Sequence, residues 1–175
     1  VDRPADDLVQ IEMHPFRAAS SCGVATMMTA HVIYREIDEM IPATLSKKIL
    51  TDVLREDLGF KGLLISDDME MKAITRIRSI EDAAVEAIAA GCDMVLLCGG
   101  DVDLQIAVIE ALIDAVEKKV ISQSRLEEAL SRQESVKSRF LAGVRRQRPI
   151  SLRALNELIG SEEHQNVATE IERLI

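Results

Sequence analysis

A chain of 175 residues, 47% hydrophobic and 29% charged, is long enough and apolar enough to bury the core of one globular domain. Its net charge of −9 argues against a nucleic-acid partner, because phosphate binding needs a basic surface. No apolar run approaches the roughly 18 residues that cross a bilayer, so we expect no membrane partner.

The cysteines and glycines give no sign of a bound group. Cys22, Cys92 and Cys98 form no Cys-x-x-Cys pair, and we interpret them as free thiols. Free thiols favour a reducing, cytoplasmic location, with export as the alternative. No metal-ligand spacing and no phosphate-binding glycine loop occurs, so the sequence predicts neither a metal nor an organic cofactor.

Short apolar runs alternate with amphipathic segments along most of the chain, which predicts strands that alternate with helices. The last third reads as helical throughout. In chain order we expect a helix over residues 8–19 broken at Pro15, a strand within 23–31, a helix over 46–58, a strand over 62–66, a helix over 79–91, a strand over 94–98, a helix over 101–118, a helix from 124 towards 140, a linker over 145–153 and a helix from 161.

Local signals mark the helix starts. Ser79 and Ser124 each precede an acidic residue by three positions, the spacing of a capping box. Asp101 or Asp103 is a suitable cap for the helix between them. Repeated strand–helix units of this kind predict an α/β fold with a parallel sheet. Three strands are few for so many helices, so we interpret the chain as a piece of a larger fold.

The most informative polar feature is the pair Asp67–Asp68 at the end of the second strand, where parallel α/β folds bind ligands. Side chains alternate along a strand, so Asp67 shares a face with Ile65, and Asp68 shares the other with Ser66. If the first face points into a barrel, Asp67 enters the pocket, and Asp68 is left to hold a loop. Two alternatives stay open: a pair of strand-end caps, or a phospho-acceptor aspartate as in receiver domains.

His31 follows the first strand and shares a face with Met27 and Thr29, which puts it at the same edge of the sheet. A hydrogen-bonded structural role and a role in the site are both compatible with that position. His14 and His164 join no constellation of catalytic or metal-binding residues.

Several separated blocks carry a family resemblance. The strand-end His31-Val pair is followed by a Pro42-containing loop, Leu58-Gly-Phe-Lys-Gly62, Ser66-Asp-Asp-Met-Glu-Met71 and Gly91-Cys-Asp-Met94. In order and spacing these blocks resemble the second half of the catalytic barrel of family three glycoside hydrolases. The Ser-Asp-Asp-Met-x-Met form is similar to the β-N-acetylhexosaminidase branch, whereas the β-glucosidase branch typically has Trp where this chain has Asp68.

The resemblance implies a partial TIM-type (β/α) barrel, about its last three βα units, followed by C-terminal helices. It implies domain bounds of 1–143 for the C-terminal half of the barrel and 144–175 for a linker and a helix that leads toward a second domain. The rest of the barrel, or another copy of the chain, is then an expected partner, because a half-barrel exposes strand edges and apolar surface.

The resemblance also implies a retaining exo-glycosidase that hydrolyses terminal β-linked N-acetylglucosamine, with Asp67 as nucleophile and His31 as a substrate contact. No residue of the chain matches the His–Asp acid/base motif of the branch, so we expect the isolated chain to be inactive. The alternatives are a β-glucosidase-type enzyme of the same family and a non-catalytic interaction domain.

Overall fold

The computed structural model describes residue 4, residues 7–141 and residues 150–174. The chain divides into two compact units, Val1–Phe140 and Leu141–Ile175. The first unit holds the sheet, and the second holds helices α7 (Leu152–Leu158) and α8 (Glu162–Glu172). The boundary predicted between residues 143 and 144 lies outside the described residues.

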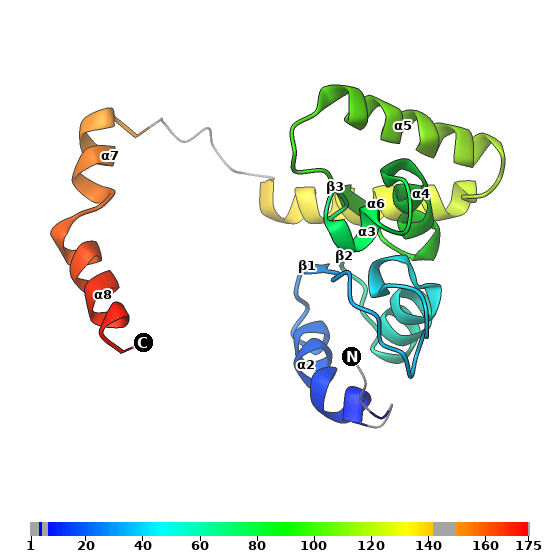
Figure 1. Cartoon of the computed structure of the whole chain (residues 1–175), viewed down its shortest axis with the longest axis horizontal. Coiled ribbons are helices and arrows are strands. Elements are labelled where there is room, and N and C mark those ends of the chain that lie inside the picture. The colour runs from blue at the N-terminus through cyan, green and yellow to red at the C-terminus, as the bar shows by residue number, and fades with distance from the viewer. Residues whose placement is uncertain (1–3, 5–6, 142–149, 175) are drawn as a thin grey trace. The chain divides into compact units, whose positions relative to one another are not determined.

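Three short strands form a parallel sheet in the first unit: β1 (Thr26–Met28), β2 (Leu63–Asp68) and β3 (Met94–Leu96). β2 lies between β1 and β3, as Figure 1 shows. The expectation of an α/β fold with a parallel sheet is confirmed. β2 is longer than predicted and includes both aspartates, whereas β1 ends before His31.

Parallel strands need crossover connections, and helices supply both of them. The π-type helix η3 (Lys48–Asp57) lies between β1 and β2, and α4 (Ile80–Ala90) lies between β2 and β3. The other helices described before residue 142 are η1 (Leu8–Glu12), α2 (His14–Ser21), η2 (Ala43–Leu45), α3 (Lys72–Thr75), α5 (Val102–Glu117) and α6 (Gln123–Leu141). None of the helices described has the length and apolar character that a membrane crossing requires.

One face of the sheet packs against these helices. Met27 of β1 and Leu64 of β2 join a buried cluster with Leu50 of η3, Ile74 of α3 and Ala87 of α4. Burying an aliphatic side chain of this size contributes about 1.5–3 kcal/mol. Because side chains alternate along a strand, this packing determines which β2 side chains are turned away from the helices.

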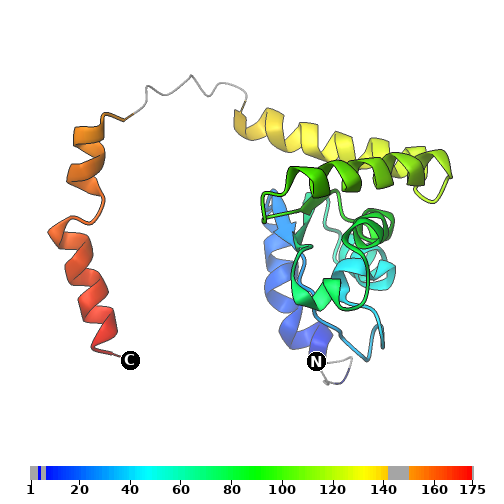
Figure 2. The ribbon, with the colours of Figure 1, turned by 45° about the horizontal axis from the view of Figure 1, so that its top comes forward.

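Helices α5 and α6 lie side by side in both views (Figure 1, Figure 2). Leu112 and Ile113 of α5 line a shared apolar hollow with Leu126 and Ala129 of α6. The amphipathic pattern that predicts these two helices therefore also accounts for their contact.

Two of the predicted helix caps are confirmed. The Ser79 hydroxyl accepts the N–H of Asp82 at 3.1 Å and begins α4. The Asp101 carboxylate accepts the N–H groups of Asp103 and Leu104 at 3.0 and 3.3 Å and begins α5. Such caps satisfy backbone donors that have no partner within the helix.

The predicted start of α6 is wrong by two residues. Ser122 rather than Ser124 precedes the helix, and its Oγ accepts the N–H of Arg125 at 3.1 Å. The hydroxyl of Ser124 lies 2.9 Å from that of Ser122 instead. Two serines at this spacing offer two capping registers, and the chain uses the earlier one.

Two further elements differ from the expectations. The helix expected over residues 8–19 is two helices, η1 and α2, and Pro15 occupies the first turn of α2, where a missing N–H costs little. The linker expected over residues 145–153 ends early, because Ser151 caps α7. Most of that linker lies outside the described residues.

Candidate functional site

Asp67 and Asp68 end β2 on opposite faces of the sheet. Leu64 and Ser66, which share the face of Asp68, are 1% and 0% exposed. Asp67 shares the other face with Ile65, and both are half-buried. The strand therefore separates the two carboxylates in the sense that alternation predicts. The catalytic role of Asp67 stays a prediction.

The two oxygens of the Asp67 carboxylate differ in their surroundings. Oδ1 accepts the N–H of Asp68 at 2.8 Å. Oδ2 has no hydrogen-bond donor among the residues that the structure describes. One oxygen thus orients the group while the other keeps its lone pairs available, an arrangement that suits a carboxylate nucleophile.

Asp68 holds a loop, as predicted from its face. Its Oδ1 accepts the N–H of Glu70 at 3.1 Å and the N–H of Cys98 at 3.3 Å. Glu70 in turn accepts the N–H of Gly99 through Oε2 at 2.5 Å. These bonds join the end of β2 to the segment that follows β3, so both strand ends are held at one edge of the sheet.

His31 reaches the same strand end from the loop after β1. Its Nε2 donates to the backbone carbonyl of Asp68 at 2.9 Å, and its Nδ1 lies 2.8 Å from the hydroxyl of Thr44. Both ring nitrogens are therefore engaged by protein atoms. A hydrogen bond from His31 to a sugar would require one of these contacts to open, and the predicted substrate contact stays a prediction.

Two threonines join this arrangement that the sequence did not single out. The hydroxyl of Thr44 lies 2.8 Å from that of Thr29, and the two residues are 0% and 8% exposed. Thr44 belongs to η2, and its neighbour Pro42 stands in one of the blocks on which the family resemblance rests. That block was a signal of importance, but it gave Thr44 no role.

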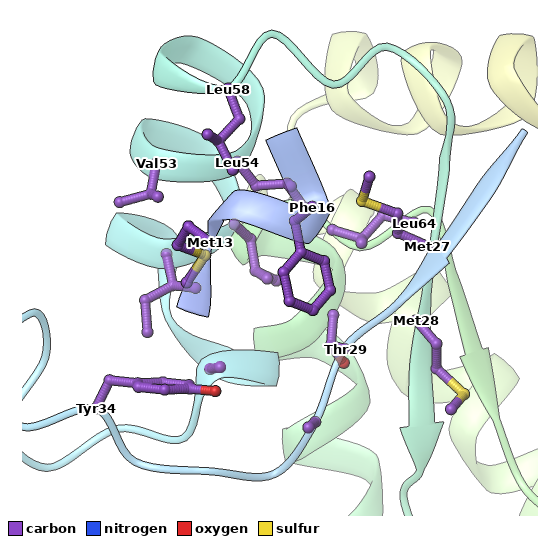
Figure 3. Close-up of a pocket in the computed structure, with 14 residues that line it drawn as sticks. Met13, Phe16, Met27, Met28, Thr29, Tyr34, Val53, Leu54, Leu58 and Leu64 are labelled. Carbon is purple, nitrogen blue, oxygen red and sulfur yellow. The ribbon is translucent and has the colours of Figure 1, made fainter. Parts of the chain in front are cut away.

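An apolar pocket lies beside β1, between α2 and η3 (Figure 3). Phe16 of α2, Met28 of β1 and Leu58 of η3 line it, and Tyr34 adds one of its few polar groups. Asp67 is not among the lining residues. Sugar recognition needs convergent polar groups, so we place the candidate site at the strand end rather than in this pocket.

Other chemistries have little support. Burial raises the pKa of the Cys92 thiol to about 12, and the charge of Asp93 raises it further. Desolvation, followed by the charge of Asp68, also raises the pKa of the exposed Cys98. Thiolates are disfavoured at both positions, which argues against a cysteine nucleophile. In the described part of the chain, no group of three or more His, Cys, Asp or Glu side chains is placed to hold a metal ion.

Residues 1–136 match the profile of the glycosyl hydrolase family 3 N terminal domain, which covers more than half of the chain. The chain belongs to glycosyl hydrolase family 3. The family resemblance predicted from the separated sequence blocks is thereby confirmed. Membership supplies a reason to expect glycosidase chemistry at a strand end of the family 3 fold, where Asp67 lies.

Curated relatives of this family 3 chain include proteins named beta-hexosaminidase. The one from Nitrosomonas eutropha is 45% identical over 92 residues, which are 53% of this chain and 26% of that protein. The one from Neisseria gonorrhoeae is 41% identical over 96 residues, 55% of this chain and 26% of that protein. The chain matches about a quarter of the length of these relatives.

Solved structures of family 3 enzymes have the same fold. A β-N-acetylglucosaminidase from a Paenibacillus species superposes with a TM-score of 0.82 at 33% identity, over 87% of this chain and 29% of that one. The β-N-acetylglucosaminidase from Thermotoga maritima gives a TM-score of 0.74 at 38% identity, over 84% of this chain and 32% of that one. The small parallel sheet with its many helices is thus similar to a part of these enzymes.

Proposed function

We propose that this chain supplies the nucleophile of a retaining exo-glycosidase that removes terminal β-linked N-acetylglucosamine. The observation that carries the proposal is the Asp67 carboxylate, which is oriented through one oxygen and open at the other at the end of β2. Family 3 membership and relatives named beta-hexosaminidase support the substrate class. The same similarity supports a partial (β/α) barrel as the surrounding architecture.

The proposed reaction has two steps. Oδ2 of Asp67 attacks the anomeric carbon as the glycosidic C–O bond breaks, and the leaving oxygen takes a proton from a general acid. The product is a covalent glycosyl–aspartate. Water, after giving a proton to the same group, then attacks the anomeric carbon and releases the free carboxylate with overall retention of configuration.

The general acid is the part of this reaction that the chain leaves open. A retaining mechanism needs it roughly 5 Å from the nucleophile. Asp68 and Glu70, the nearest acidic residues in sequence, accept backbone N–H groups and hold the loop. We therefore propose that the acid/base group and the remaining strands come from outside these 175 residues.

The nucleophile is testable by covalent labelling. A fluorinated N-acetylglucosaminyl fluoride slows release of the glycosyl–enzyme, so peptide mass spectrometry of the whole enzyme should find the sugar on the peptide that contains Asp67. The Asp67→Asn variant should remain unlabelled, whereas Asp68→Asn, which keeps the loop-holding oxygen, should still be labelled. A sugar on any other residue would refute the assignment.

Turnover separates the proposed enzyme from its alternatives. The whole enzyme should release nitrophenol from nitrophenyl-N-acetylglucosaminide far faster than from nitrophenyl-glucoside, and the reverse order would favour the β-glucosidase-type alternative. The isolated 175-residue chain should hydrolyse neither, because its carboxylate lacks a proton donor. Turnover by the isolated chain close to that of the whole enzyme would contradict the proposed division of the site.

We also propose that the enzyme works in a reducing, cytoplasmic compartment. The chain has three cysteines, and all of them are free, including the buried Cys92 and the exposed Cys22 and Cys98. Structural disulfides are characteristic of oxidising compartments, and exposed free thiols are poorly suited to them. Fractionation of cells that express the whole enzyme, followed by immunoblotting, tests the location.

A further inference from the structure

We propose that His31 is a positioning residue for Asp67, which it orients through the backbone of Asp68 rather than by touching the substrate. The inference rests on the proposed function, in which Asp67 is the nucleophile, and it assigns a role to residues that the reaction itself does not use. Thr44 and Thr29 belong to the same device, because their hydroxyls determine which nitrogen of His31 carries the proton.

The hydrogen-bond partners determine the direction of each bond. The carbonyl oxygen of Asp68 has no hydrogen, so Nε2 of His31 must donate to it. A neutral imidazole carries only one N–H, and its Nδ1 is then an acceptor. The Thr44 hydroxyl therefore donates to Nδ1, and it accepts in turn from the hydroxyl of Thr29. The result is a directed chain from Thr29 through Thr44 and His31 to Asp68.

Burial fixes this chain in place. Thr44 is 0% exposed and Thr29 is 8% exposed, so water has little access to either hydroxyl. A buried hydroxyl without a partner costs free energy, which holds the two threonines to each other and to the imidazole. The loop from β1 to η2 is thereby tied to the end of β2 over 37 residues of sequence, the separation of His31 and Asp68.

The chain ends on the residue that holds the nucleophile. The N–H of Asp68 donates to Oδ1 of Asp67, while the carbonyl of Asp68 accepts from His31. Rotation of the Asp68 backbone would move both groups, so the bond to His31 restricts the direction in which Oδ2 of Asp67 points. Catalysis is sensitive to such restriction, because an error of about 1 Å in a reacting group can cost roughly a hundredfold in rate.

The competing role, direct contact between His31 and the sugar, makes a different demand on the ring. A nitrogen that binds substrate must give up either Asp68 or Thr44 in the bound state. A positioning residue keeps both partners throughout the reaction. The tautomer of the ring and the separation of kcat from KM therefore distinguish the two roles.

The first experiment is an NMR measurement of the imidazole nitrogens in the isotope-labelled 175-residue chain, which has only three histidines. We expect the Nε2–H tautomer at His31 near neutral pH, and the Nδ1–H tautomer would overturn the proposal. Thr44→Val removes the hydroxyl that Nδ1 needs and should shift the His31 nitrogens and the Asp68 amide. Thr44→Ser should restore them, and failure of either variant to behave so would overturn the role of the threonines.

The second experiment measures kinetics in the whole enzyme that contains this chain. His31→Ala should lower kcat and the rate of fluoro-sugar labelling at Asp67 by about ten- to a hundredfold, with KM within about twofold. His31→Gln, whose amide can donate to the Asp68 carbonyl, should recover much of this loss. The matched control is His164→Ala on the exposed surface of α8, which should change neither constant.

The outcomes separate this proposal from the one beneath it. A rise in KM with kcat unchanged in His31→Ala would identify a substrate contact and refute positioning. An unlabelled Asp67 in the unmodified enzyme would refute the proposed nucleophile, and with it the role of His31 in catalysis. The Nε2–H tautomer would in that case survive as a structural observation, so the two failures are distinguishable.

Discussion

At the scale of single residues, β2 gives two identical side chains different surroundings. Asp67 and Asp68 are adjacent, yet one keeps an oxygen open and the other accepts two backbone N–H groups. Strand alternation alone produces this difference, since consecutive side chains point to opposite faces. The chemistry proposed for the site therefore depends on register: a shift of one residue would exchange the two carboxylates.

Asp68 should be needed for the order of the segment after β3. In Asp68→Ala, the amide of Cys98 loses its carboxylate acceptor, so its hydrogen exchange should become about tenfold faster, as expected for the loss of one hydrogen bond to a charged group. Asp68→Asn keeps an oxygen acceptor and should stay near the unmodified rate. Unchanged exchange in the alanine variant would show that the loop is held by other contacts.

The cysteines should differ in reactivity. Burial raises the pKa of Cys92 to about 12, so at about pH 8 its thiol is neutral as well as covered. A thiol-specific disulfide reagent should therefore titrate two thiols in the folded chain, the exposed Cys22 and Cys98, and a third only after denaturation. Three fast-reacting thiols in the folded chain would contradict the burial of Cys92.

The residue scale also shows what sequence can and cannot predict. The separation of Asp67 from Asp68 is predictable, because period-two alternation needs only a correct strand. The contacts of His31 are not, because Thr44 lies 13 residues away and reaches the ring through a loop whose path follows no periodic rule. Sequence places His31 at the strand end, and tertiary structure decides what it touches.

At the scale of elements, a buried ion cluster joins α6 to the sheet. Asp93, directly before β3, has a fully buried side chain that binds Arg55 of η3 and Arg125 and Arg132 of α6. Its Oδ2 also accepts the N–H of Leu64 at 2.9 Å. Desolvation lowers the pKa of Arg55 although Asp93 opposes that shift, which indicates how little water reaches the cluster.

Removal of this carboxylate should strongly destabilise the first unit. Asp93→Ala leaves three guanidinium groups without their shared partner, and the loss of one member of a buried pair costs about 3–5 kcal/mol. The free energy of unfolding from urea titration should fall by that amount. The matched control is Glu86→Ala, which removes an exposed partner of Arg78 and should cost less than about 1 kcal/mol. Similar losses in the two variants would argue against a special role for Asp93.

Helix starts and ion clusters differ in how far sequence can predict them. The caps at Ser79 and Asp101 involve residues two or three positions apart, so spacing alone reveals them. The cluster around Asp93 joins residues separated by 29 to 39 positions, beyond any local pattern. The offset at α6 has a third cause, since Ser122 and Ser124 both offer a cap and local rules do not rank them.

At the scale of the whole chain, the described part of the sheet has three strands, and β1 and β3 each pair only with β2. Each therefore has an outer edge with unpaired backbone groups, a surface on which other strands can pair. Sequence predicts this outcome well, because alternating strands and helices dictate a parallel sheet, and the count of strands follows from the count of apolar runs. The family 3 relatives that this chain matches are about four times its matched length, so we expect other protein to cover these edges in the whole enzyme.

In isolation the chain should instead associate with itself. Met28 of β1 is 60% exposed beside an outer edge of the sheet, and an apolar strand edge favours pairing between chains. Light scattering should give a mass above the monomer value of 19.3 kDa that rises with concentration. Met28→Lys places a charge next to the edge, a change that opposes strand pairing, and should shift the mass toward the monomer. Lys119→Glu, a charge change at the end of α5 away from the sheet, is the control that should leave association unchanged. A monodisperse monomer across the concentration range would show that the helices already present protect the edge.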